Sequence, residues 1–198
     1  MRRTEFVEIF ARLRDAEVVI TGPGGVSGAL CHAADLPATI YNMEMGYATA
    51  MCLGLALGQP ELKVVALEGD GSMVAGLSVL STIGRYPAAN LIVVIVHNGV
   101  YASTGSGVVA TAAGLRTDLA AVAAGCGIDA GHIRTVSEPG EAEDALATAL
   151  AEPGPWVIIG RVDQADPGPR RLPTRDLVET SLAMHQELIR RRLARAVS

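Results

Sequence analysis

Aromatic residues, cysteines and basic charge are all scarce in this chain of 198 residues. Aromatic residues occupy 4% of the positions, and the net charge is −5. Nucleic acid is not expected as the main partner, because phosphate backbones demand a basic protein face. Apolar residues make up 49% of the chain, which favours close packing of helices on a sheet over a disulfide scaffold or a disordered chain. The length suffices for one compact domain with a sizeable core.

The three cysteines, Cys31, Cys52 and Cys126, lie far apart in the sequence. No pair has the short spacing of a zinc or iron–sulfur site, so each is predicted to be a small buried side chain in a reducing compartment. The N-terminal region is charged throughout, and the longest apolar run is too short to cross a bilayer. We therefore predict a cytoplasmic protein with no signal peptide and no membrane association.

Apolar runs typical of buried strands alternate with segments of helical periodicity along most of the chain. This alternation predicts the α/β class, with a doubly wound parallel sheet flanked by helices on both faces. The predicted domain spans residues 1–162. Residues 163–198 are predicted to form a connector and a C-terminal helix that packs on the same domain or on a partner. The expected strands cover residues 17–21, 38–41, 63–68, 91–96, 132–136 and 156–162, with a single helix over 72–84 and a loop over 98–113.

The most informative pattern is Gly69-Asp70-Gly71-Ser72 at the end of one predicted strand, with Asn98 after the next. If the two strands are parallel neighbours, Asp70 and Asn98 project from the same carboxyl edge, where open α/β sheets bind ligands. A carboxylate, an amide oxygen and a backbone carbonyl form a hard oxygen set that suits Mg²⁺, and the amides of Gly71 and Ser72 open a helix that favours phosphate. The pattern predicts a magnesium and diphosphate site, in which the metal and backbone amides neutralise the phosphate. An ordinary strand–helix turn and an ordinary loop asparagine are the alternative.

Three motifs, in this order along the chain, resemble those of thiamine diphosphate-dependent enzymes. Residues 44–48, before an Ala- and Leu-rich helix, are similar to the MGYA-like segment of 2-oxo acid decarboxylases. Residues 69–72 followed by Asn98 resemble the diphosphate-binding motif of these enzymes. Residues 98–105 are similar to the N-x-x-Y-x-S-T-G stretch of the sulfopyruvate and phosphonopyruvate decarboxylases. The resemblance covers about residues 18–162 and implies the thiamine diphosphate-binding fold, with thiamine diphosphate and Mg²⁺ as cofactors.

The resemblance also implies which residues hold the metal and the cofactor. Asp70 and Asn98 would be magnesium ligands, and the backbone carbonyl of Val100 would be the third protein oxygen. The diphosphate would lie against two glycine-containing turns that follow neighbouring strands. The residues assigned to cofactor binding in this part of the site are Gly24, Gly25, Ser27, Gly46, Gly69, Gly71 and Ser72.

Two methionines and three residues of the following loop complete the implied site. Met45 takes the place of the bulky apolar residue that holds the cofactor in its bent form, and the Met43 carbonyl would accept a hydrogen bond from the cofactor's amino group. A core methionine on an apolar helix face is the alternative for Met45. Tyr101, Ser103 and Thr104 would line the mouth of the pocket, with a glycine-bounded turn carrying surface hydroxyls as the alternative.

The family pairs this kind of domain with a pyrimidine-binding domain that carries an activating glutamate, and a chain of 198 residues has no room for both. Glu44 and Glu68 stand in the wrong places for that role and are predicted to be loop or turn residues. The chain therefore resembles the β subunit of a split enzyme such as sulfopyruvate decarboxylase. The resemblance implies a separate pyrimidine-binding α subunit that supplies the glutamate, a heterotetramer or larger assembly, and no activity of this chain alone.

The implied reaction is decarboxylation of a small 2-oxo acid. Residues 106–111 are smaller and more apolar than the polar stretch that the resemblance to the sulfopyruvate and phosphonopyruvate decarboxylases implies there, which leaves room for a less charged 2-oxo acid or for a carboligation partner. A carboligase subunit (acyloin or acetolactate-type synthase) and a non-catalytic cofactor-binding module are the alternatives. A ferredoxin-linked oxidoreductase subunit would need closely spaced cysteines. A dinucleotide-binding module is not favoured, because position 27 of the glycine-rich turn is Ser rather than Gly.

His97 adjoins one of the implied metal ligands. Side chains of consecutive strand residues point to opposite faces of a sheet. If Asn98 faces the metal, His97 is therefore predicted to point away from it.

Overall fold

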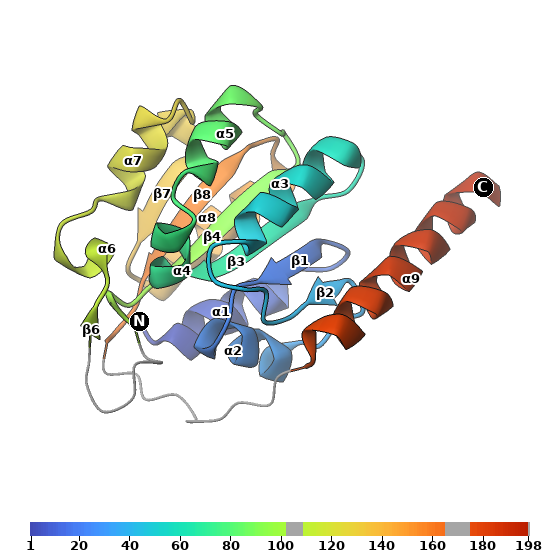
Figure 1. The fold of residues 1–198 in the computed structure, drawn as a ribbon, viewed down its shortest axis with the longest axis horizontal. Coiled ribbons are helices and arrows are strands. Elements are labelled where there is room, and N and C mark those ends of the chain that lie inside the picture. Colours follow the sequence, from blue (N-terminus) through green and yellow to red (C-terminus); the bar gives the residue numbers. More distant parts are fainter. Residues whose placement is uncertain (102–108, 165–174, 198) are drawn as a thin grey trace.

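A computed structural model describes residues 1–101, 109–164 and 175–197 of the chain. The strands of its main sheet are β1 (Val18–Thr21), β2 (Thr39–Ile40), β3 (Val64–Gly69), β4 (Leu91–His97), β7 (Ile133–Val136) and β8 (Trp156–Arg161). All neighbouring strands in this sheet are parallel, and their order is β2-β1-β3-β4-β8-β7 (Figure 1). The predicted doubly wound α/β fold is confirmed.

Helices cover both faces of this sheet. One face packs against α1 (Arg3–Leu13), α2 (Gly25–Ala33) and α8 (Pro139–Ala151), and the other against α3 (Ala48–Gly58), α4 (Asp70–Ala75), α5 (Val79–Arg85) and α7 (Leu119–Gly125) (Figure 1). The central strand β4 is apolar at six consecutive positions, 91–96, because both faces of the sheet are covered by helices. Alternate side chains of this run enter the two separate cores, so every position is buried.

The C-terminal helix α9 (Leu177–Val197) lies against the edge strand β2 and then extends beyond the sheet (Figure 1). Its Thr180 and Met184 side chains are buried, and Thr180 Oγ1 accepts a hydrogen bond from the Tyr41 N–H over 3.3 Å. The Asn42 side-chain amide donates to the Arg175 carbonyl at 3.1 Å. This helix therefore packs on the same domain, while part of the predicted connector, residues 165–174, lies outside the described residues.

The helix expected over residues 72–84 is two helices, because α4 ends at Ala75 and α5 begins at Val79. At the break, the backbone of Gly46 approaches so closely that a Cβ on Gly76 would overlap the Gly46 carbonyl oxygen. Only glycine permits this contact. The break thus lets the loop before α3 pack against the end of α4.

The loop expected over residues 98–113 contains regular structure in its described part. It includes β5 (Val100–Tyr101) and β6 (Val109–Ala110), which pair antiparallel, and the beginning of α6 (Ala112–Leu115). A short 3₁₀ helix, η1 (Ala130–His132), precedes β7.

The cysteines differ in their burial. All three are free thiols; Cys52 is buried as predicted, whereas Cys31 and Cys126 are only half-buried. None of the described helices combines the length and the apolar character that a membrane crossing requires.

Candidate cofactor and metal site

Asp70 and Asn98 leave neighbouring parallel strands at the carboxyl edge of the sheet. β3 and β4 pair so that Gly69 lies opposite Val96, and each candidate ligand follows its strand directly. Asp70 is the first residue of α4 and is only 1% exposed. The structure thus brings the two residues to the edge where the sequence predicts them. Their role as metal ligands stays a prediction.

Two polar side chains contact the Asp70 carboxylate. Thr111 Oγ1 donates a hydrogen bond to Asp70 Oδ2 over 2.5 Å, and His97 Nδ1 lies 3.3 Å from the same oxygen. The prediction that His97 points away from the candidate site is therefore wrong. Alternation of side chains holds only within a strand, and β4 ends at His97, so the rule does not extend to Asn98 in the turn that follows.

Thr111 is a site residue that sequence reasoning missed. Its side chain is fully buried, and its hydroxyl also accepts a hydrogen bond from the Gly114 N–H at 2.9 Å, which caps α6. Its own N–H donates to the Gly99 carbonyl at 2.9 Å. Thr111 therefore ties Asp70 to the turn that carries Asn98. A threonine before a short helical segment is a recognisable N-cap signal, but nothing in that signal indicates a contact with Asp70.

The turn after β4 holds Asn98 in a defined arrangement. Asn98 Oδ1 accepts a hydrogen bond from the Val100 N–H at 3.2 Å, and Gly99 has a φ of +74°. A Cβ on Gly114 would overlap the Gly99 carbonyl oxygen, so the turn lies directly against α6. A carboxamide oxygen has two lone pairs, so Asn98 Oδ1 retains one for a metal.

Glu68 is fully buried in β3, so the prediction that it is a loop or turn residue is wrong. Its carboxylate accepts hydrogen bonds from the N–H and the hydroxyl of Thr49, each at 2.7 Å, and from the Ser72 hydroxyl. Ser72 Oγ in turn accepts a hydrogen bond from the Gly46 N–H at 3.0 Å. This network joins α3, β3 and α4. The Ser72 hydroxyl is thus bound within the protein, and its backbone amide is the group left for the predicted diphosphate contact.

The loop before α3 carries the two methionines of the predicted site. The Met43 N–H donates to the Thr21 carbonyl at 3.0 Å, and Gly46 has a φ of +85°. Met45 precedes the helix and is 41% exposed, which rules out the alternative of a core methionine. Glu44 is exposed in the same loop, as predicted. Support of a bent cofactor by Met45 stays a prediction.

The glycine-rich turn after β1 leads into α2. Gly24, with a φ of +81°, precedes the helix, and among the described residues no side chain caps the first amides of α2. Ser27 is fully buried, and its hydroxyl accepts a hydrogen bond from the Asn42 N–H at 3.1 Å, so it supports the loop before α3. Arg3, at the start of α1, lies directly over Gly25. Arg3 is a second residue near the site that no sequence motif indicated.

Tyr101 lies against the first turn of α4. Its ring is so close to the backbone of Gly71 that a Cβ there would overlap it. Position 71 therefore accepts only glycine while Tyr101 keeps this place. Ser103 and Thr104, which are predicted to line the same mouth, lie outside the described residues.

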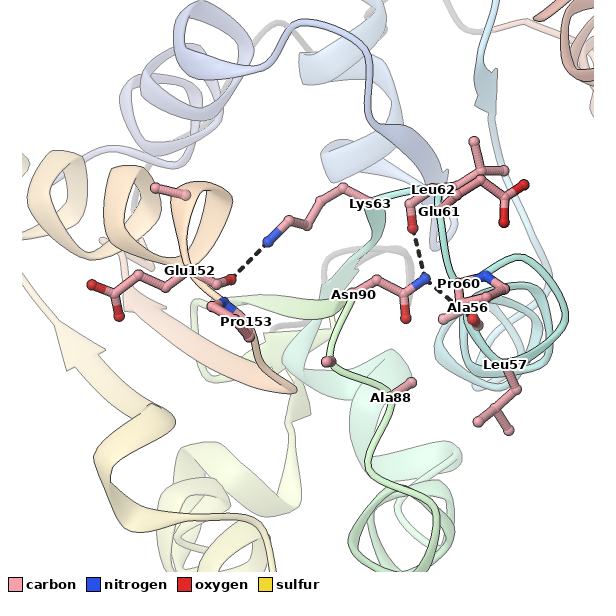
Figure 2. Close-up of a pocket in the computed structure, with 12 residues that line it drawn as sticks. Ala56, Leu57, Pro60, Glu61, Leu62, Lys63, Ala88, Asn90, Glu152 and Pro153 are labelled. Carbon is pink, nitrogen blue, oxygen red and sulfur yellow. Dashed lines mark hydrogen bonds between the residues drawn. The ribbon is translucent and has the colours of Figure 1, made fainter. Parts of the chain in front are cut away.

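A cavity of about 460 Å³ opens at the opposite, amino edge of the sheet (Figure 2). Its polar side chains hold the ends of helices. The Asn90 side-chain amide donates to the carbonyls of Ala56 and Leu62, and Lys63 Nζ donates to the Glu152 carbonyl at 2.7 Å. These bonds satisfy backbone carbonyls at and just beyond the ends of α3 and α8, which is a structural role.

Residues 29–159 match the family described as thiamine pyrophosphate enzyme, C-terminal TPP binding domain. The chain belongs to this family. Its relatives include a phosphonopyruvate decarboxylase of Streptomyces viridochromogenes, 40% identical over 146 residues, and the sulfopyruvate decarboxylase subunit beta of Methanocaldococcus jannaschii, 35% identical over 155 residues. The resemblance to thiamine diphosphate-dependent decarboxylases that the motifs indicate is confirmed.

This thiamine pyrophosphate enzyme domain matches only part of some relatives and nearly the full length of others. The match with the phosphonopyruvate decarboxylase covers 73% of this chain but only 35% of that protein. The match with the M. jannaschii subunit beta covers 78% of this chain and 79% of that subunit. For the subunit beta of Methanococcus maripaludis, 32% identical, the shares are 92% and 94%. The solved benzoylformate decarboxylase of Polynucleobacter necessarius gives a TM-score of 0.69 over 88% of this chain and 34% of that one. At 19% identity, this likeness shows the fold.

Proposed function

We propose that this chain is the β-type subunit of a cytoplasmic, thiamine diphosphate- and Mg²⁺-dependent decarboxylase of small 2-oxo acids. It binds the diphosphate end of the cofactor, and a separate α subunit supplies the pyrimidine-binding domain with its activating glutamate. Family membership and the match in length to the sulfopyruvate decarboxylase β subunits support the proposal. The observation that carries it is the buried Asp70 carboxylate, beside Asn98, at the carboxyl edge of the sheet.

The residues at this edge fit a magnesium–diphosphate group. Asp70 forms no ion pair with a lysine or arginine among the described residues. A buried charge is costly unless it is paired, so a divalent cation between Asp70 and Asn98 would offset that cost. No three histidine, cysteine or acidic side chains converge on a metal within the described ranges. The remaining ligands would therefore be the Val100 carbonyl and the diphosphate itself.

The residues of this chain would bind and orient the cofactor. Thiamine diphosphate supplies the electron sink for loss of CO₂ from a 2-oxo acid. Asp70 and Asn98 would hold the magnesium ion, and the backbone amides at the start of α4 would hold the diphosphate. Met45, which is exposed at the edge, would support the bent form of the cofactor, and the Met43 carbonyl would accept a hydrogen bond from its amino group.

Exposed apolar side chains beside the site favour a partner chain. Met45, Tyr47 and Met51 are 41%, 63% and 42% exposed, and they lie in the loop before α3 and in its first turn. Exposed apolar side chains that cluster in this way mark interaction surfaces.

Neither glutamate near the site is available to activate the cofactor. The Glu68 carboxylate is committed to three hydrogen bonds and Glu44 lies in a solvent-exposed loop. The activating glutamate would thus come from the α subunit, in a heterotetramer or larger assembly, and this chain alone would be inactive.

Calorimetric titration with Mg²⁺ and thiamine diphosphate tests the cofactor site. Asp70→Asn should abolish the Mg²⁺-dependent part of binding, because it removes the charged candidate ligand. Asp144→Asn, on the exposed face of α8, makes the same change in net charge and should leave binding unchanged. Wild-type affinity in Asp70→Asn would contradict the assignment.

Release of CO₂ from a panel of 2-oxo acids tests the activity. The panel contains pyruvate, sulfopyruvate, phosphonopyruvate and longer apolar acids, each with this chain alone and with a co-expressed candidate α subunit. Cofactor-dependent release by the pair only would support the split enzyme and identify the substrate class. An ordinary enzymatic rate from the single chain would contradict the need for a partner. A stable, cofactor-binding pair that releases no CO₂ would favour carboligation or a non-catalytic module instead.

A further inference from the structure

Arg3 places its guanidinium against the glycine-rich turn at the start of α2. Its guanidinium is so close to Gly25 that a Cβ there would lie 2.5 Å from Nη1 and 2.9 Å from Cζ. Arg3 Nε is buried, and within the described part of the chain it has no hydrogen-bond partner and Arg3 forms no ion pair. We propose that Arg3 binds a phosphate group of the cofactor diphosphate. This inference rests on the proposed function.

The first turn of α1 lies at the same edge of the sheet as the candidate metal ligands. The Met1 carbonyl accepts a hydrogen bond from the Asp163 N–H at 3.0 Å, just past the end of β8. The neighbouring Val162 N–H donates to the His97 carbonyl at 3.0 Å, at the end of β4. Figure 1 shows the N-terminus at this edge of the sheet. Arg3 thus lies at the edge to which Asp70 also belongs.

Two features of the turn favour an anion beside Arg3. The first amides of α2 have no side-chain cap from the part of the chain that the structure describes. The earliest of them that forms a helical hydrogen bond is the Gly28 N–H, which donates to the Gly24 carbonyl at 3.1 Å. Free amides and the helix dipole attract an oxyanion at this end. A guanidinium with a buried and unpartnered N–H group raises the free energy of the folded chain. A phosphate oxygen held between Arg3 and these amides would satisfy both sets of donors.

The contribution of Arg3 changes the expected charge balance of the site. The sequence predicts that a metal and backbone amides alone neutralise the diphosphate in a chain of net charge −5. An arginine adds a fixed positive charge and a planar pair of donors suited to phosphate. Arg3 would therefore act as a binding residue for the cofactor, with no part in the bond-breaking steps.

Titration of the full chain with two probes tests this assignment: Mg²⁺ with inorganic pyrophosphate, and Mg²⁺ with thiamine diphosphate. Arg3→Met keeps the apolar stem and removes the guanidinium, and it should weaken both affinities about tenfold or more. Arg2→Met makes the same charge change at an exposed neighbour and should alter them less than about twofold. Equal effects of the two variants would overturn the role of Arg3 and leave the diphosphate site standing. Absence of binding of either probe to the wild-type chain would overturn the proposed function, and this inference with it.

A second variant, Gly25→Ala, tests the same contact by changing the residue against which the guanidinium lies. Gly25 has no positive φ, so Gly25→Ala suits its backbone, but the added methyl group would displace the guanidinium. It should weaken pyrophosphate binding to a similar extent as Arg3→Met, and the double variant should bind no more weakly than either single variant. Additive losses would overturn the assignment, because they would show that the two residues act separately.

The thermal stability of the ligand-free chain separates binding from packing. Arg3→Met should leave Tm unchanged or raise it, because it removes an unpaired cation, while it reduces the Tm increase that pyrophosphate produces. An arginine that served only to pack on Gly25 would give the opposite result: a lower ligand-free Tm with an unchanged ligand response. Arg3→Lys, which keeps the charge and loses the planar pair of donors, should bind with intermediate affinity.

Discussion

Replacing Thr111 by valine tests how far one buried hydroxyl organises the candidate metal site. Valine has nearly the shape of threonine, so the change removes two hydrogen bonds and leaves no cavity. The bond to the Asp70 carboxylate is charge-assisted and contributes about 1.5–3 kcal/mol, and the capping bond from the Gly114 N–H about 1 kcal/mol. We therefore expect the free energy of unfolding to fall by roughly 2–4 kcal/mol. For a chain of this length, Tm should fall by roughly 5–15 °C.

Urea denaturation of matched variants measures this effect. Thr111→Ser keeps both hydrogen bonds and loses one methyl group, which costs about 1 kcal/mol. Thr82→Val, on the exposed side of α5, controls for the substitution itself and should change stability by less than about 0.5 kcal/mol. If Thr111→Val were as stable as wild type, or if serine cost as much as valine, the argument from the two hydrogen bonds would be refuted. Loss of this support for Asp70 should also weaken Mg²⁺-dependent cofactor binding about 10- to 100-fold.

Three further predictions, which use three substitutions and one thiol-labelling experiment, concern the packing of the domain. Gly76→Ala should destabilise the chain, because its Cβ would overlap the Gly46 carbonyl oxygen, whereas Gly54→Ala, whose Cβ meets nothing within 4 Å, should stabilise α3 by up to about 1 kcal/mol. Thermal denaturation compares them, and equal effects would contradict the close approach. Glu68→Gln should cost about 1–3 kcal/mol in urea denaturation, because an NH₂ group replaces an acceptor oxygen; a neutral effect would argue against the buried network. Burial raises the pKa of the Cys52 thiol well above its usual range, so a thiol reagent at pH 8 should label Cys52 only after unfolding. Because its folded-state pKa is the higher one, its contribution to stability is complete below the unfolded pKa of about 8.5 and is lost as the pH rises towards the folded value. Rapid labelling of Cys52 in the folded chain would show that it is accessible.

The sequence predicts best what depends on local pattern. An apolar run followed by a glycine-containing turn locates Asp70, and the run over 91–96 locates Asn98, because each residue directly follows a strand. The parallel sheet follows from the alternation of strands and helices. These features need no knowledge of how distant segments meet.

Contacts between distant segments are the part that the sequence does not predict. Thr111 reaches Asp70 only because α6 packs against the turn after β4, and Arg3 reaches Gly25 only because α1 and α2 begin at the same edge. The helical periodicity over 72–84 continues through the break between α4 and α5, since the cause of the break is the approach of a remote loop. Glu68 ends the predicted strand over 63–68 and directly precedes the Gly-Asp-Gly-Ser turn, but the sequence does not show that its carboxylate is buried or that it binds Thr49 and Ser72.

The C-terminal segment that contains α9 helps to hold the loop before α3. Thr180 and the Arg175 carbonyl hold Tyr41 and Asn42, the residues from which the loop before α3 departs. The same helix shields β2, whose two residues form an edge of the sheet and would otherwise offer unpaired backbone groups to another chain. A chain that ends at residue 162 would lose both the hydrogen bonds that hold this loop and the helix that covers the edge strand β2. We therefore expect removal of α9, which lies outside the matched family domain, to lower both cofactor affinity and resistance to aggregation.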